Sequence, residues 1–154
     1  MKRNQMVAVG GLVLCSAVLL VWGVFAGAPG GMGIVAAEGD ALIEASTQPD
    51  AVMDGVVVID RAVSPEAAFI VIHQNDNGKP GMRVGIQPIP PGESADVVVE
   101  LDSKENPGES VIAAVHADRG TPGQFDFDMD NMNHSADRPF FVGGHEVAVV
   151  IELQ

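Results

Sequence analysis

The sequence predicts an all-β domain, an antiparallel sandwich or barrel of about seven strands, preceded by one N-terminal apolar helix. From residue 53 onward, apolar and polar residues alternate with a period of two, and turn residues recur about every ten residues. No window in that stretch has helical periodicity, which favours a sandwich or barrel over a mixed fold. The length of 154 residues is typical of a single domain with an extension.

Residues 1–26 predict a signal peptide or a signal anchor. Lys2 and Arg3 precede an uncharged apolar run over 6–26, about the 20 residues that cross a bilayer as a helix. The basic end stays inside, so both alternatives place the rest of the chain outside the cytoplasm. The length of the run slightly favours an uncleaved anchor over a secreted protein. The membrane is then a partner through this helix.

Residues 27–52 predict a flexible tether, and residues 53–154 the β-sandwich domain. The tether is rich in Gly, Ala and Pro with scattered acids, a composition that buries little apolar surface. Cleavage before Glu38 follows small residues but lies far from the apolar run, whereas cleavage after Ala28 is disfavoured by Pro29.

Each strand is predicted from a β-branched or alternating run that ends at a turn signal. The predicted strands are Gly55–Asp60, Ala67–His73, Met82–Gln87, Asp96–Leu101, Val111–Ala117, Gln124–Asp128 and Glu146–Leu153. In the last of these, the odd-numbered residues 147–153 form the inward face, so Val150 points outward.

Five segments resemble one family of extracytoplasmic domains. They are FIVIH at 69–73, GIQPIPPGESADVVVELD at 85–102, VIAAVHAD at 111–118, GQFDF at 123–127, and DRPF with a Gly-Gly turn at 137–144. The family is the domain of unknown function 7282 of haloarchaeal and bacterial exported surface proteins. The resemblance implies an immunoglobulin-like sandwich and an exported location, and it implies no activity.

Charge and composition exclude several classes of function. The net charge is −13, and all 21 acids lie at or after Glu38, so the exported part repels a phosphate backbone and nucleic acid is not an expected partner. Cys15, inside the apolar run, is the only cysteine, so the domain has no disulfide, thiolate metal site or cysteine nucleophile.

An acidic segment imitates a calcium loop. Acids stand at positions 1, 3, 5 and 12 of the twelve-residue pattern: Asp126, Asp128, Asp130 and Asp137. Position 6 is Asn131 rather than Gly, and Phe125 and Phe127 alternate with the acids as they would in a strand. A solvated acidic face is therefore the favoured interpretation, with calcium as the alternative and no other cofactor expected.

His73 and His116 each lie near the end of an apolar strand. Imidazoles suit copper or zinc, but neither residue belongs to a metal-binding spacing, so hydrogen bonds to loop carbonyls are favoured. Three chain reversals separate the two strands, which predicts antiparallel strands with the histidines at opposite poles, roughly 20 Å apart, sharing no ion.

No nucleophile motif is present, since Gly92–Asp96 (GESAD) lacks the final glycine of a nucleophile elbow. We therefore expect no enzyme activity. The expected function is an exported, non-catalytic surface or interaction module with an extracytoplasmic partner. The alternative is an extracytoplasmic metal-binding domain, with calcium at 126–137 ahead of copper or zinc at the histidines.

Overall fold

The computed structural model describes residues 40–48, 51–102 and 105–153, and this part of the chain is all-β. Its nine strands, all antiparallel where they pair, are β1 (Leu42–Glu44), β2 (Val56–Ser64), β3 (Ala68–Asp76), β4 (Lys79–Ile89), β5 (Gly92–Glu100), β6 (Ser110–Ala117), β7 (Phe141–Val142), β8 (His145–Glu146) and β9 (Ala148–Glu152). Two short helical segments, α1 (Ala51–Asp54) and the 3₁₀ segment η1 (Met129–His134), lie between strands.

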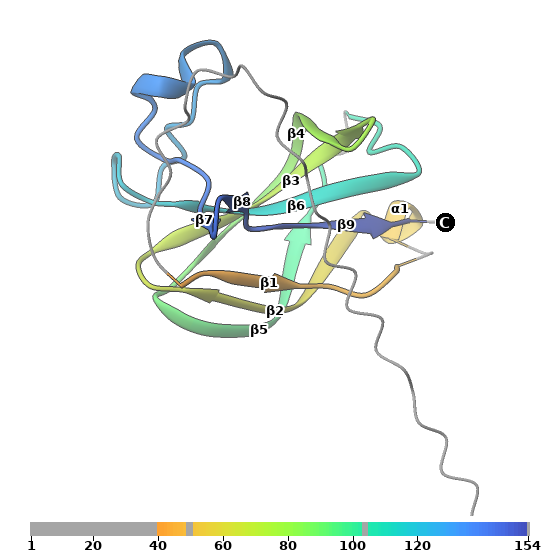
Figure 1. Ribbon diagram of the computed structural model, residues 1–154. Coiled ribbons are helices and arrows are strands. Elements are labelled where there is room, and N and C mark those ends of the chain that lie inside the picture. The colour runs from red at the N-terminus through yellow and green to blue at the C-terminus, as the bar shows by residue number, and fades with distance from the viewer. Residues whose placement is uncertain (1–39, 49–50, 103–104, 154) are drawn as a thin grey trace, which may run out of the picture.

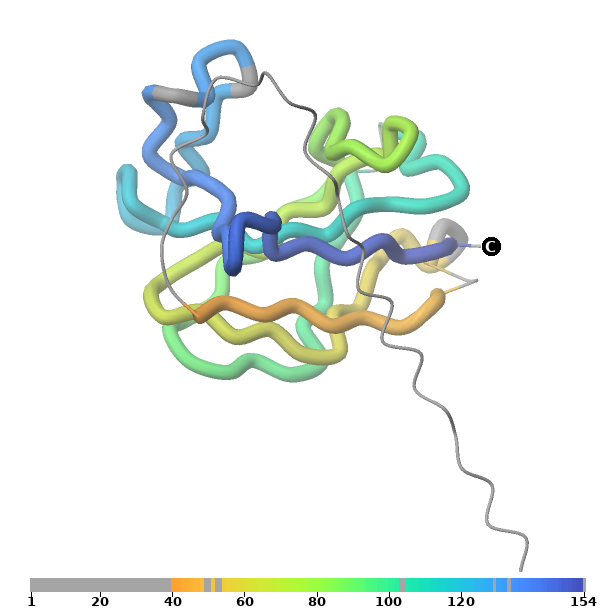
Figure 2. The backbone as a smooth tube through the Cα atoms, in the orientation of Figure 1, coloured from red at the N-terminus to blue at the C-terminus, as the bar shows by residue number. Residues whose placement is uncertain are grey.

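The strands form two layers and a small hairpin. One layer has the order β1-β2-β5, the other β4-β3-β6-β9, and β7 pairs with β8. Figure 1 shows the three-stranded layer below the four-stranded one. The segment from 118 to 140, which joins β6 to β7, arches away from both layers in the tube view (Figure 2).

Alternating residues of the two layers fill the core between them. Ile70 and Ile72 of β3 and Val115 of β6 are fully buried there, facing Val57 and Ile59 of β2. Burying a Val or Ile side chain contributes about 1.5–3 kcal/mol relative to exposure, so this two-sided core supplies the main stabilisation.

The two layers also meet along β4 and β5. Gly85 forms an isolated bridge with Leu101, and a Cβ at Gly85 would lie 2.9 Å from the carbonyl oxygen of Glu100. Only glycine permits this approach of one backbone to another.

The structure confirms the all-β antiparallel prediction and corrects it in two places. Gln124–Asp128 is not a strand, because its backbone N–H groups are taken by side chains: Asp126 N–H by Asp137, and Asp128 N–H by Ser135. Leu42–Glu44, in the stretch predicted to be a tether, is strand β1 and pairs with β2. Ile43 of this strand is buried and packs in the hydrophobic core.

The predicted helix at 6–26 lies outside the described residues. Within the ranges described, no helix has the length and apolarity needed to cross a bilayer.

Candidate functional site

The outer face of the four-stranded sheet is covered, although most sandwich sheets expose one face to water. Phe69, Val71 and His73 of β3 point outward together with Ile112 and His116 of β6, and all five are buried. Both strands read as nearly continuous apolar runs, which is typical of strands buried on both faces. The cover comes from the segment 118–140, whose Phe125 and Phe127 reach back over the sheet.

Each buried imidazole is fixed by one carbonyl. Nδ1 of His73 lies 3.0 Å from the oxygen of Gly81 on β4, and Nδ1 of His116 lies 3.0 Å from the oxygen of Asp137. A carbonyl only accepts, so Nδ1 donates in both cases and carries the proton of the neutral ring. Nε2 is then the unprotonated nitrogen with a free lone pair.

Burial keeps both rings neutral. It lowers the pKa of His116 to about 4, opposed by the hydrogen bond to Asp137 and reinforced by His73. Burial also lowers the pKa of His73, opposed by the hydrogen bond to Gly81 and reinforced by the charge of Arg83. At neutral pH the sheet therefore presents two neutral nitrogen donors.

The two imidazoles are neighbours. Their ring centroids lie 5.9 Å apart with an interplanar angle of 32°. The predicted antiparallel strand direction is correct, but the predicted separation of roughly 20 Å is wrong. β3 and β6 pair directly, with His116 opposite Phe69, four residues before His73. That offset is about 13 Å along the strands, so the two side chains lean toward each other over the Val71–Ala114 pair.

A pocket of about 210 Å³ opens above His73 and is lined by His73, Arg83, Phe125 and Phe127. The guanidinium carbon of Arg83 lies 5.6 Å from the centroid of the Phe125 ring, a cation–π contact. His116 lies under the same aromatic cover, with its ring centroid 5.4 Å from that of Phe125 and 5.0 Å from that of Phe127, both edge to face.

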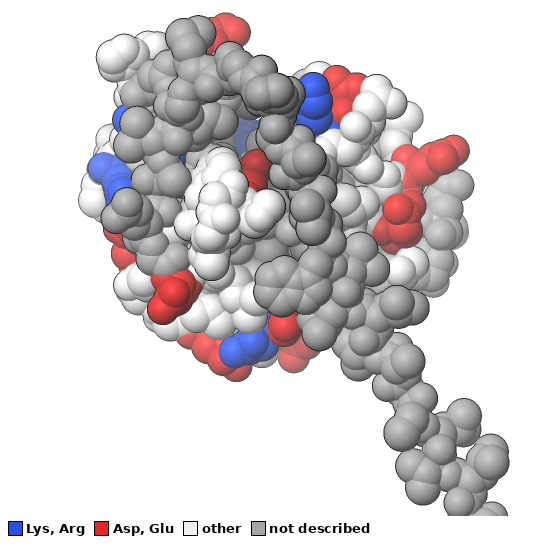
Figure 3. Space-filling view, viewed as in Figure 1, with Lys and Arg blue, Asp and Glu red and all other residues white. Residues whose placement is uncertain are grey.

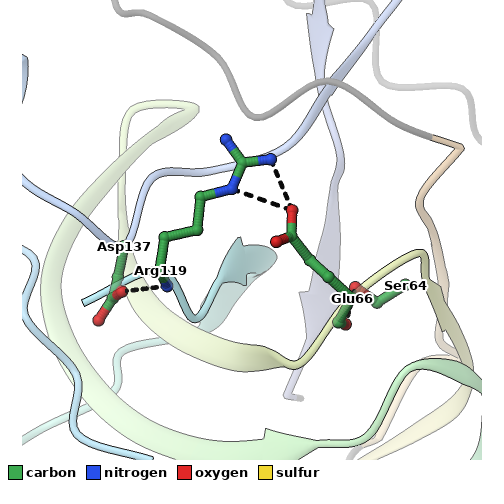
Figure 4. A network of polar contacts seen from close by, with 4 residues as sticks. All are labelled: Ser64, Glu66, Arg119 and Asp137. Atoms are coloured by element: carbon green, nitrogen blue, oxygen red, sulfur yellow. Dashed lines mark hydrogen bonds and ion pairs between the residues drawn. The ribbon is translucent and has the colours of Figure 1, made fainter. Parts of the chain in front are cut away.

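Asp137 holds this cover in place. Its side chain is fully buried, and one carboxylate oxygen accepts hydrogen bonds from the backbone N–H groups of Arg119 (2.8 Å) and Gly120 (2.9 Å). The other oxygen accepts from the N–H of Asp126, next to both phenylalanines. Figure 4 shows the hydrogen bond from Arg119 N–H to Asp137 beside the ion pair of Arg119 with Glu66, whose nitrogen and oxygen atoms lie 2.6 Å apart. Since the carbonyl of Asp137 also binds His116, one residue positions both the aromatic cover and the ring beneath it.

Three of the four acids of the predicted calcium loop accept hydrogen bonds from backbone amides, and the fourth, Asp130, is exposed. Asp126 accepts from Thr121 N–H at 2.8 Å, Asp128 caps η1 by accepting from Asp130 N–H at 2.9 Å, Asp130 is exposed and Asp137 is buried. Within the described ranges, no three His, Cys, Asp or Glu side chains are grouped so as to hold a metal ion. Calcium binding by this segment stays a prediction.

Sequence reasoning missed Arg83, Phe125 and Phe127 as pocket residues. One feature of the sequence could have indicated them. FIVIH and VIAAVHA have no polar face, which indicates that another segment covers both strands. The two-residue spacing of Phe125 and Phe127 is compatible with a strand of a sheet and with an extended segment that covers one. The hydrogen bonds of Asp137 to the backbone of this segment show that it is the second.

Comparison with known proteins gives one match. The family model described as Domain of unknown function (DUF7282) matches residues 41–153. No curated protein and no solved structure matches the chain.

Proposed function

Because this chain belongs to the family described as domain of unknown function 7282, whose description assigns no activity, we propose its function from the pocket geometry. The protein is an exported, non-catalytic binding module on an immunoglobulin-like sandwich, and it binds its ligand or partner at the pocket over the four-stranded sheet. The observation that carries this proposal is the combination of His73, Arg83, Phe125 and Phe127 around one open cavity.

These groups are suited to binding. Phe125 and Phe127 offer apolar surface, Arg83 offers a fixed positive charge, and His73 offers a neutral acceptor whose orientation is set by Gly81. Aromatic walls with a few oriented polar groups are the usual make-up of a small-molecule or ion site. The domain is acidic, and on the face drawn in Figure 3 red side chains outnumber the blue ones, so its surface repels nucleic acid.

A second candidate function is an extracytoplasmic metal-binding domain. It is favoured by the proximity of His73 and His116 rather than by the acidic segment 126–137, because the two imidazoles lie side by side and each has an unprotonated Nε2. In this function the pocket is the entry path to the metal.

Thermal unfolding of the full chain in detergent tests the pocket. The probes are benzoate, calcium, zinc and monovalent copper, each added after EDTA treatment and removal of the chelator. A ligand that binds only the folded protein at 100 times its Kd adds about 2.7 kcal/mol of stability, which raises the midpoint by several degrees.

We expect at least one probe to raise the midpoint of the wild type and of His145→Leu, but not that of His73→Leu. His145 is exposed on β8 and serves as the matched control. If no probe shifts the midpoint, or if the shift survives in His73→Leu, the pocket is not the binding site.

A further inference from the structure

We propose that His73 and His116 together bind one monovalent copper ion through their Nε2 atoms, in a two-coordinate site beneath Phe125 and Phe127. This inference rests on the second candidate function above and names its ion. The argument concerns the direction of the donors, their spacing, and the charge that the surroundings tolerate.

The hydrogen bonds of the two rings turn their Nε2 atoms toward each other. Gly81 belongs to β4, on the side of β3 away from β6, so Nδ1 of His73 points away from His116. Pro139 forms a bridge with His116 on the side of β6 away from β3, and Asp137 lies two residues before Pro139. Nδ1 of His116 bonds the carbonyl of Asp137 on that side, so it points away from His73. Nε2 lies roughly opposite Nδ1 in an imidazole, and both Nε2 atoms therefore face the space between the strands.

The spacing of the rings fits one shared ion. With metal–nitrogen bonds of about 2 Å, two imidazoles on one ion have centroids about 5 Å apart at a tetrahedral angle and about 6 Å apart in a linear arrangement. The observed 5.9 Å lies near the linear limit. Each ring also donates its other N–H to a backbone carbonyl, which is the usual support for a metal-bound histidine.

Ligand number and charge select the monovalent ion. Zinc in structural sites has four ligands, whereas the described residues bring only these two donors together. Monovalent copper is a closed-shell ion that is stable with two nitrogen ligands in a line. The free energy of transferring an ion from water into the protein interior rises with the square of its charge. Since His116 is only 2 % exposed, this desolvation is about four times more unfavourable for a divalent ion than for a monovalent one.

The neighbours reinforce this selection. Arg83 lies beside His73 and repels a divalent ion twice as strongly as a monovalent one. The rings of Phe125 and Phe127 lie next to His116 and shield it from water. The site thus suits a weakly hydrated ion of single charge.

Competition with a chromophoric chelator tests the proposal under anaerobic conditions, with the full chain in detergent and ascorbate present to keep copper monovalent. We expect one copper ion per wild-type chain, and an affinity at least about 100-fold lower in His73→Leu and in His116→Leu. His134→Leu and His145→Leu, which change exposed histidines, should bind as the wild type does. Near-ultraviolet circular dichroism of each variant shows whether it is folded, and a folded His73→Leu suffices for the conclusion.

X-ray absorption at the copper edge gives a second measurement. We expect a first shell of two nitrogen donors, and a shell of three or four donors would overturn the two-coordinate site. Wild-type affinity in folded His73→Leu would overturn it as well. If copper does not bind but zinc or benzoate still raises the thermal midpoint in the wild type and not in His73→Leu, the copper site is wrong and the proposed binding function is retained. If all probes fail, both are wrong.

Discussion

His116 is a weak base in surroundings that oppose its charged form. Its ring is buried between the sheet and the rings of Phe125 and Phe127, and His73 lies beside it. The groups that act on its charge are the imidazole of His73, which opposes it, and Asp137, whose carbonyl and carboxylate favour it. Desolvation is the largest of these effects and brings the pKa down to about 4.

This depressed pKa makes the stability of the metal-free protein depend on pH. Above the ordinary pKa of about 6.5, His116 is neutral in both states and its full contribution is present. As pH falls from 6.5 toward 4, the unfolded chain binds a proton that the native state refuses, so the stability falls by about 1.4 kcal/mol per pH unit, roughly 3 kcal/mol in all.

Urea unfolding at pH 7, 6, 5 and 4 in the presence of EDTA measures this contribution. We expect His116→Gln to be less stable at pH 7 but to lose less stability on acidification than the wild type does. His145→Gln, which changes an exposed ring, should retain the wild-type pH dependence. Equal pH dependence in wild type and His116→Gln would contradict the assignment.

At the scale of elements, β9 closes the four-stranded sheet and presents two unlike faces. Ile151 is 1 % exposed and belongs to the core, whereas Val150 is 36 % exposed on the opposite face. Val149 is partly buried against the core, and Leu153 continues the inward face. The alternation predicted for the odd-numbered residues 147–153 is therefore confirmed.

Ile151→Asp is expected to abolish folding, and Val150→Asp to be tolerated. An unpaired carboxylate in the core costs several kcal/mol, which is comparable to the whole stability of a domain. The soluble yield and the thermal midpoint of the two variants provide the test. Similar behaviour of both variants would show that the two faces of β9 are assigned incorrectly.

The segment between β6 and β7 depends on one carboxylate rather than on a strand ladder. Asp137 gathers three backbone N–H groups that lie 11 to 18 residues away in the chain. Hydrogen bonds to a charged group contribute about 1.5–3 kcal/mol each, so this carboxylate replaces much of the order that a strand would provide.

Asp137→Asn should destabilise the protein by about 3 kcal/mol, because the amide nitrogen then meets at least one N–H donor in a fully buried position. Limited proteolysis should cut within 118–136 faster than in the wild type, and urea unfolding gives the energy. Asp130→Asn, at an exposed acid of the same segment, should change neither measurement. Unchanged proteolysis in Asp137→Asn would mean that other contacts hold the cover.

For the whole molecule, the sequence predicts what is local and misses what depends on register. The β-branched runs at FIVIH and VIAAVHA locate β3 and β6 to within a few residues, because periodicity and turn residues are local signals. Two strands separate them in the chain, and nothing in their composition shows that they pair directly with His116 opposite Phe69. The proximity of the histidines and the contacts of Asp137 both join residues distant in sequence, so the candidate site emerged only with the fold.

Export is the last prediction, and it concerns the chain as a whole. A periplasmic-type phosphatase fused after Gln154 should be active, because we expect the apolar run over 6–26 to direct the acidic domain out of the cytoplasm while Lys2 and Arg3 stay inside. Replacing both basic residues by Glu should lower the activity, since they supply the whole positive-inside bias, and deleting residues 1–26 should abolish it. The control is a fusion to a protein that fluoresces only in the cytoplasm, and we expect this fusion to be dark.

N-terminal sequencing of the exported product then distinguishes an uncleaved anchor from a cleaved signal peptide. An uncleaved anchor retains the N-terminal segment and sediments with membranes. A product that begins at Glu38 would instead be secreted, because cleavage there removes the whole apolar run. High activity of the cytoplasmic fluorescent fusion, with an inactive phosphatase, would contradict export in either form and would leave the proposed site facing a reducing cytoplasm.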